Sequence, residues 1–239
     1  MRTPGFVLDS RASLGESPLW PTAAIVAAAV LYADLPGRFI AGPSASAFSA
    51  LRVIVPGLTF VLLAVLLATP PHGRLARNLG WPAQKLHVTR RVLSLVMIGV
   101  VSAANGISIV WLVHLLVNGA HANAPPLLRA AVHMWVVNVL LFGLWFWQLD
   151  AGGPVARPHS LPRDRDFLFP QHTEPELAAG GWNPMFLAYL FVAFTNAAAF
   201  SPTHTLPLSR WAKMLMLVEA AISLTLAVMV VARAVNILR

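Results

Sequence analysis

Two polar residues in the last apolar stretch of the chain are the strongest candidates for chemistry. Glu219 lies about 12 Å beyond Trp211 if the stretch is helical, at about 1.5 Å per residue. Ser223 follows one turn later on the same helix face. A carboxylate in apolar surroundings is costly and usually faces protein or water. Glu219 could therefore line a pore or accept a proton, or it could lock helix packing as a protonated or paired side chain.

The densest polar group beside apolar sequence comes shortly before that stretch. It consists of Thr195, Asn196, Ser201, Thr203, His204 and Thr205. If the protein conducts or senses anything, we expect this group to take part. His204 would titrate near neutral pH and could gate the mouth of a pore. The alternative is an ordinary outer loop with helix-capping hydroxyls.

Four further polar residues interrupt apolar sequence: Asn105, His114, His133 and Asn138. The two asparagines are expected to hold helices together by hydrogen bonds. The histidines are single residues on different helices, without a second ligand at metal-binding spacing, so we expect core histidines and no metal site. Phosphate-binding, nucleophile-elbow and dinucleotide motifs are absent, and so is cysteine. We expect neither a cofactor nor an enzymatic activity.

The composition indicates the solvent that surrounds these residues. The chain of 239 residues is 57% hydrophobic and only 11% charged, whereas soluble domains carry about 25% charged residues. The net charge is +8, but the basic residues lie at the ends of apolar runs instead of forming one dense patch. This pattern favours contact with lipid head groups over nucleic acid. We expect an all-α, polytopic helix bundle in a lipid bilayer, and we expect that bilayer to be a bacterial cytoplasmic membrane.

Six apolar segments are candidates for membrane helices, which need about 17–25 residues. They are Leu19–Ala33, Val53–Thr69, Val92–Gly119, Ala130–Leu149, Met185–Phe200 and Trp211–Ile237. The first and fifth are short, and the fifth, residues 185–200, could instead re-enter the membrane as a pore helix beside five crossings. The segments divide the chain into an N-terminal segment (1–18), helices 1–3 (19–129) and a C-terminal module (130–239).

The basic residues suggest an orientation. With six crossings and the N-terminus inside, twelve of the 17 Lys and Arg residues face the cytoplasm and five face outward, which is the expected bias. If residues 185–200 re-enter and the C-terminus stays inside, the counts reverse. Six crossings with both termini cytoplasmic are therefore the preferred prediction.

One long polar stretch, residues 150–183, contains five prolines and the charged run Arg163–Asp166. Loops of more than about 15 residues without structure are usually functional or disordered. Phe167–Phe169 within it is apolar enough to dock on the bilayer surface or on the helix bundle. The stretch is a candidate partner-binding loop.

Residues 138–237 resemble the pore module of two-transmembrane potassium channels. Val137–Trp145 is similar to the outer helix, Tyr189–Thr195 to the pore helix and Met214–Arg233 to the inner helix. The resemblance implies a homo-oligomer, a tetramer by analogy with the family. The family often has a glutamate at the position of Glu219 without using it in the filter, which slightly favours a packing role for this residue.

The filter itself departs from the family pattern. Its positions fall on six residues: Ala199, Phe200, Ser201, Pro202, Thr203 and His204. Both family glycines are missing, and Pro202 fixes a backbone angle where the filter needs freedom. Because a potassium filter aims successive carbonyl groups at the pore axis, we do not expect potassium selectivity.

Two functions remain open on these residues. The first is a channel-like membrane protein that passes inorganic ions without selecting potassium. The second is a non-conducting membrane scaffold or regulatory partner that acts through the 150–183 loop.

Overall fold

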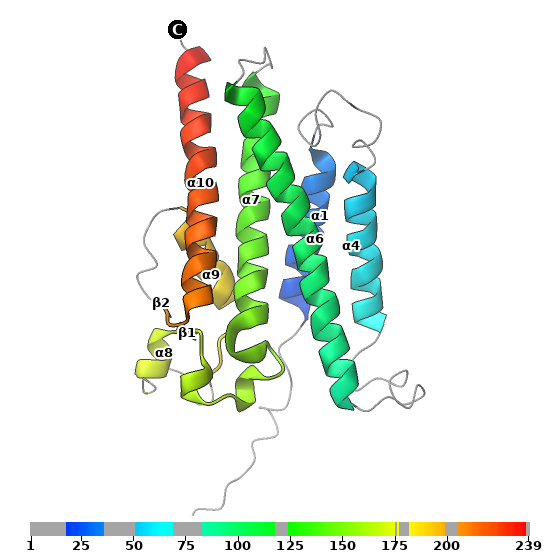
Figure 1. Cartoon of the computed structure of the whole chain (residues 1–239), viewed down its shortest axis with the longest axis vertical. Coiled ribbons are helices and arrows are strands. Elements are labelled where there is room, and N and C mark those ends of the chain that lie inside the picture. The colour runs from blue at the N-terminus through cyan, green and yellow to red at the C-terminus, as the bar shows by residue number, and fades with distance from the viewer. Residues whose placement is uncertain are drawn as a thin grey trace, which may run out of the picture.

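The computed structural model describes residues 18–35, 51–68, 83–117, 124–174, 176, 182–198 and 205–237. Within these ranges the chain is helical apart from one pair of two-residue strands, which confirms the all-α prediction. Six apolar helices pack together (Figure 1). They are α1 (Leu19–Asp34), α4 (Leu51–Ala68), α6 (Ala83–Val117), α7 (Ala124–Leu149), α9 (Phe186–Ala197) and α10 (Arg210–Ile237).

Three of these helices are long and apolar enough to cross a membrane. They span Val88–Val117, Pro126–Gly152 and Arg210–Ala232, which supports an integral membrane protein. Helices satisfy their own backbone hydrogen bonds, as a lipid environment requires. The helices α1, α4 and α9 are apolar but shorter.

Helix α7 is the centre of the bundle and packs against α1, α6, α9 and α10. In the most apolar 18-residue stretch of α7, 61% is buried inside the protein. The corresponding shares are 44% for α6 and 22% for α10. Residues on several of its faces, including Met134, Val137 and Phe146, are fully covered. One core lies between α7, α6 and α1, and a second lies between α7, α9 and α10.

The helix directions define two ends of the bundle. We call the base the end where α7 finishes, at the bottom of Figure 1, and the other end the distal end. At the base Gln148 of α7 donates to Ser94 near the start of α6 at 2.5 Å, and Arg90 donates to Leu66 near the end of α4 at 2.8 Å. At the distal end His133 of α7 lies 3.6 Å from Asp34 at the end of α1.

The two described ends of the chain therefore lie apart. Helix α1 begins at the base, whereas α10 runs upward to end at the distal end (Figure 1). Both termini on one side would need an even number of helices along the bundle, whereas within the described residues α1, α4, α6, α7 and α10 lie along it.

Helix α9 explains the difference. It starts at the base, where Tyr189 hydrogen-bonds to Asp150, and its 12 residues extend only about 18 Å. The chain is at the base again by Leu206, because strand β2 (Leu206–Pro207) pairs antiparallel with β1 (Phe167–Leu168). The start of α9 and strand β2 thus lie at the same end of the bundle, whereas six crossings would place them at opposite ends.

The long polar stretch is folded against the base over residues 150–174. It forms three 3-10 turns (Asp150–Gly152, Arg157–His159 and Pro162–Asp164), then β1 and the short helix α8 (Pro170–Thr173). Phe167 and Phe169 are only 0% and 4% exposed. They dock on the helix bundle, which was one of the two expected positions.

Candidate functional site

Helix α9 sits between α7 and α10 and buries one face, formed by Phe186, Tyr189, Val192, Ala193 and Ala197. These positions recur at helical spacing, which explains why a short apolar segment can dock as a helix. The α7 backbone comes close at Gly143, where an added Cβ would lie 3.1 Å from the Cα of Leu190. The absence of a side chain at this glycine therefore permits the tight approach of the two helices.

A buried carboxylate fixes the entrance of α9. Asp150, 1% exposed, directly follows α7. Its Oδ1 accepts the backbone N–H groups of Asp166 at 2.8 Å and Phe167 at 3.2 Å. Its Oδ2 accepts the hydroxyl of Tyr189. One side chain thus joins the end of α7, the start of β1 and the first turn of α9.

Arg157 supplies the opposite charge. Its Nε lies 3.4 Å from Oδ2 of Asp150, and both side chains are almost completely buried. The guanidinium also donates to the carbonyl oxygens of Pro184, at 3.0 Å, and Trp147. It lies 4.6 Å from the ring centroid of Tyr189, within the range of a cation–π contact. Because buried charges are stable only when paired and hydrogen-bonded, this geometry makes the pair a structural anchor.

Asp166 connects the same anchor to α10. Its Oδ2 accepts the N–H of Ala151 at 3.1 Å, and its Oδ1 accepts the indole N–H of Trp211 at 2.8 Å. Its carbonyl oxygen accepts the N–H of Leu208 at 2.8 Å. We call Asp150, Arg157, Asp166, Tyr189 and Trp211 the basal anchor. Through these contacts, the ends of α7, α9 and α10 are held together at the base.

Aromatic side chains shield the basal anchor. The Phe167 ring meets those of Phe146, Tyr189 and Trp211 at centroid distances of 5.1–6.1 Å. His172 of α8 lies against Trp182 at 5.2 Å. Burial, with a smaller contribution from Arg165, lowers the pKa of His172 from 6.5 to about 4, although Asp150 acts in the opposite direction. The imidazole is therefore neutral at neutral pH.

The predicted residue Glu219 lies beside α9. It is 0% exposed, and its Oε2 accepts the side-chain N–H of Asn196 at 2.8 Å. Asn196 also donates to the carbonyl oxygen of Met216 at 2.8 Å. The other oxygen, Oε1, has no hydrogen-bond partner in the described part of the chain. This oxygen is the candidate for binding a proton or a cation.

A second polar contact joins α7 and α10 directly. Asn138 of α7 donates to Ser223 of α10 at 3.3 Å, and both residues are buried. The contact thus brings together two residues that the sequence had singled out. Thr195 donates instead to carbonyl oxygens of its own helix, those of Phe191 and Val192.

The other predicted residues lie away from α9 or cannot be placed. Asn105 donates to the carbonyl oxygen of Met134 at 3.5 Å, between α6 and α7. His133 approaches Asp34, and His114 lies 5.2 Å from the ring of Trp111. The filter-equivalent positions lie outside the described residues: Ala199, Phe200, Ser201, Pro202, Thr203 and His204.

Sequence reasoning missed the basal anchor. It interpreted residues 150–183 as a candidate partner-binding loop and did not single out Asp150, Arg157 or Asp166. The signal of this anchor in the sequence was the glycine-containing turn after α7. In this turn Ala151, Gly152 and Gly153 all have positive φ angles, of 50°, 82° and 97°. A Cβ on Gly153 would lie 2.9 Å from the carbonyl oxygen of Gln148. Such a sharp reversal brings the residues that follow back onto the end of α7.

Comparisons with protein-family models, curated proteins and solved structures give no match.

Proposed function

We propose that the chain is one subunit of a channel-like integral membrane protein. In this assignment α7 is the outer helix, α9 a re-entrant pore helix and α10 the inner helix. The observation that carries the proposal is the course of α9, which starts at the base and is followed by a return to the base at Leu206. A short helix held between two long ones is the arrangement that the resemblance to potassium-channel pore modules implies.

The proposal gives the chain five membrane crossings, by α1, α4, α6, α7 and α10. Twelve of the 17 Lys and Arg residues belong to segments that begin or end at the base, and five belong to distal segments. The excess of basic residues marks the cytoplasmic side. We therefore place the base, and with it the entrance of α9, in the cytoplasm, and the end of α10 on the opposite side of a bacterial cytoplasmic membrane.

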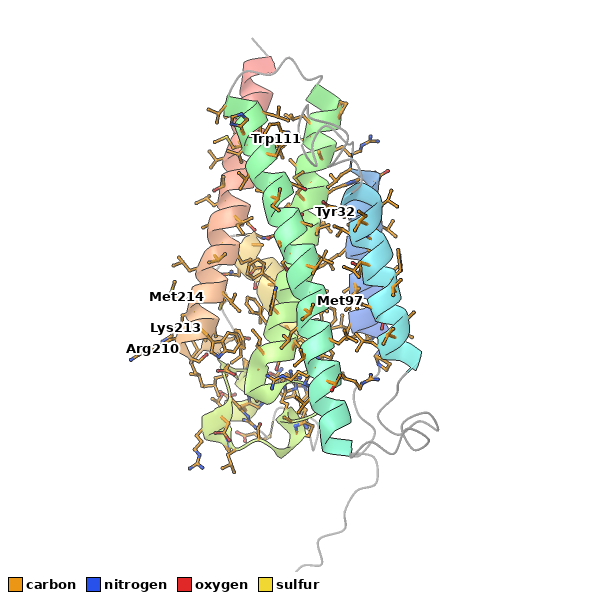
Figure 2. The ribbon with its side chains drawn as sticks, turned by 45° about the vertical axis from the view of Figure 1, so that its right-hand side comes forward. Tyr32, Met97, Trp111, Arg210, Lys213 and Met214 are labelled. Carbon is orange, nitrogen blue, oxygen red and sulfur yellow. The ribbon has the colours of Figure 1, made fainter. Side chains whose placement is uncertain are left out.

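A channel formed by these helices needs several copies around one axis. The described face of α10 leaves Leu217 and Leu224 about three-fifths exposed, and α9 leaves Phe191 53% exposed. Figure 2 shows Arg210, Lys213 and Met214 pointing away from the bundle at the start of α10. These exposed side chains suit contact with lipid or with neighbouring copies. We propose a homo-oligomer, with four copies by analogy to the family.

Glu219 is the side chain through which the proposed pore can be tested. Asn196 holds one carboxylate oxygen, whereas Oε1 lacks a hydrogen-bond partner among the described residues. Glu219→Gln keeps the shape of the side chain and its contact with Asn196, but it removes the ionisable carboxyl group that could bind a proton or a cation. Glu174→Gln is the matched control, because Glu174 is exposed at the base.

The experiment measures sodium and potassium flux into liposomes that contain the purified protein. We expect flux of both ions without potassium selectivity, since the glycines of the filter pattern are missing. Glu219→Gln should lower the flux and Glu174→Gln should leave it unchanged. Folded, inserted wild-type protein that passes neither ion over a range of voltage and pH would rule out conduction.

A non-conducting scaffold is the second candidate. It is supported by the 150–174 region, which is fixed to the base and presents Arg163 at 81% and Asp164 at 53% side-chain exposure. Such a rigid charged surface suits a partner protein. Reversing the charge of Arg163 should then weaken cross-linking to the partner without affecting insertion, and unchanged cross-linking would argue against this surface.

A further inference from the structure

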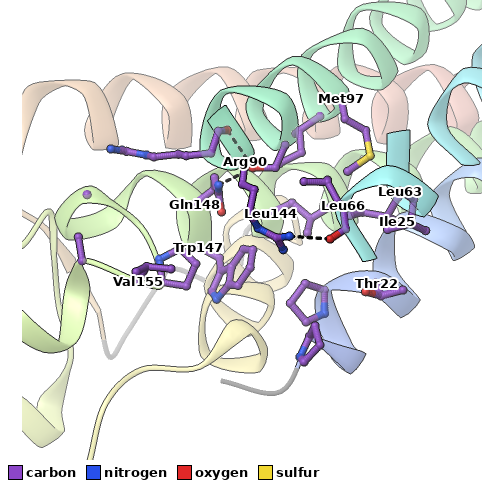
Figure 3. A pocket seen from close by; sticks show the side chains of 18 of the residues that line it. Thr22, Ile25, Leu63, Leu66, Arg90, Met97, Leu144, Trp147, Gln148 and Val155 are labelled. Atoms are coloured by element: carbon purple, nitrogen blue, oxygen red, sulfur yellow. Dashed lines mark hydrogen bonds between the residues drawn. The ribbon is translucent and has the colours of Figure 1, made fainter. Parts of the chain in front are cut away.

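A cavity at the base lies on the side of α7 that faces α1, α4 and α6. It has a volume of about 620 Å³ and lies between α1, α4, α6, α7 and the turn at residues 152–156 (Figure 3). This volume is within the range of about 300–1,000 Å³ that small-molecule sites occupy. Its walls are largely apolar, and Ile25, Leu63, Met97 and Leu144 each come from a different helix.

Two arginines supply the charge of the cavity. Arg90 and Arg91 are its only charged residues within the described part of the chain, and no acidic side chain lines it there. Thr22, Ser94 and Gln148 add neutral polar groups. A site with an apolar interior and a purely positive charge fits an occupant with a hydrocarbon part and an anionic head.

The guanidinium of Arg90 is held in position at this site. Its Nη1 donates to the carbonyl oxygen of Leu66, near the end of α4, at 2.8 Å (Figure 3). A guanidinium carries five N–H donors in a fixed plane, a geometry that suits phosphate oxygens. Arg91, which is exposed, forms no salt bridge within the described residues.

The position of the cavity indicates which class of ligand it binds. Both arginines lie in the first turns of the membrane-spanning part of α6, which begins at Val88. A membrane protein meets the phosphates of the surrounding leaflet at this depth, and basic pockets between helices on the cytoplasmic side bind anionic head groups. A soluble anion would not need the apolar interior, because that interior contributes only by burying hydrocarbon.

We propose that this cavity is a binding site for one anionic phospholipid, with its phosphate at Arg90 and Arg91 and part of an acyl chain among the apolar walls. The site does not depend on ion conduction. It lies beside α1 and α4, on the side of α7 away from the proposed pore helix.

The test uses the full-length protein in detergent and measures lipid binding by native mass spectrometry. The probes are phosphatidylglycerol and phosphatidylcholine with matched chains, and inorganic phosphate and laurate serve as competitors. We expect wild-type protein to prefer phosphatidylglycerol. Arg90→Gln and Arg91→Gln should each weaken that preference about fivefold, as expected when one basic residue near a lipid head group is lost.

Two further variants separate the site from general effects. Arg129→Gln is the matched control, because Arg129 is exposed on α7 toward the distal end, and it should leave the preference unchanged. Ile25→Trp should fill the apolar part and weaken binding of both lipids, with the protein still monodisperse. Phosphate alone should not displace the lipid.

Several results would overturn the proposal. Equal binding of both lipids by wild-type protein would remove the role of the arginines. An equal loss in the Arg129 control would indicate nonspecific attraction. Complete displacement by inorganic phosphate would indicate a simple anion site, and displacement by laurate at the same concentration as phosphatidylglycerol would identify a fatty-acid site.

Discussion

Replacing Asp150 by alanine tests whether the basal anchor holds α9 in place. Asp150 is 1% exposed, accepts three hydrogen bonds and pairs with Arg157 at 3.4 Å. The substitution would leave the buried guanidinium without its counter-charge and two backbone N–H groups without their acceptor. Removing one partner of a buried pair costs about 3–5 kcal/mol, so we expect a loss of folding free energy of about that size.

The chain offers a matched control for this substitution. Asp164 lies 3.9 Å from Arg163, but both side chains are more than half exposed. An exposed pair contributes about 0–1 kcal/mol, so Asp164→Ala should change stability by less than about 1 kcal/mol. The two variants therefore compare the same residue type in a buried and an exposed ion pair.

The assay is reversible unfolding in mixed micelles, followed by tryptophan fluorescence. Trp147, Trp182 and Trp211 all contact the basal region, so the signal reports the affected structure. A loss below about 1 kcal/mol for Asp150→Ala, equal to that of the Asp164 control, would refute the anchor. Separately, a double-mutant cycle that combines Asp150→Ala with Arg157→Met measures how strongly these two side chains are coupled.

Two further outcomes follow from the packing and electrostatics of the described residues. Gly143→Ala should destabilise the protein by about 1–3 kcal/mol in the same unfolding assay, because its Cβ would lie 3.1 Å from the Cα of Leu190. Gly106→Ala, where the space is open within 4 Å, should be neutral or stabilising, and equal losses in both would contradict the close approach of α7 and α9. The pKa of His172 is lowered to about 4 in the folded protein, so the unfolded chain binds more protons at that residue between about pH 4 and 6.5. Stability should therefore fall more steeply in wild type than in His172→Gln as the pH is lowered through this range, and parallel curves would contradict the burial of the imidazole.

The sequence predicted the helical class because it depends on local patterns, and apolar length indicated the long helices. Asn105 and Asn138 were expected to join helices by hydrogen bonds, whereas Glu219 was left open between a pore-lining and a packing role. Asn196 was selected only as part of a polar cluster. Its contact with Glu219 depends on how α9 docks on α10, which helical spacing cannot show.

The course of α9 could not be decided by counting charges. With six crossings, Arg210 and Lys213 are outside, and Arg233 and Arg239 are inside. With five crossings and the N-terminus inside, these two pairs exchange sides, so both arrangements give the same distribution of twelve and five basic residues. The sequence argument considered re-entry only with the C-terminus inside and therefore preferred six crossings.

The basal anchor was missed for a related reason. Asp150, Arg157 and Asp166 are close in sequence, but their burial comes from Tyr189 and Trp211, which lie on α9 and α10. Among prolines and exposed charges, the buried ion pair has no local signature. Only the positive φ angles after α7 direct the chain back onto the bundle.

The side of the membrane on which residues before and after α9 lie tests the central claim most directly. The chain has no cysteine, so single cysteines at positions 163, 208 and 129 can be labelled with a membrane-impermeant maleimide in intact cells and in inverted vesicles. Arg163, Leu208 and Arg129 are all exposed. We expect positions 163 and 208 to be labelled only in inverted vesicles, and position 129 only in intact cells. Labelling of positions 163 and 208 from opposite sides would show that α9 crosses the membrane and would contradict the re-entrant arrangement.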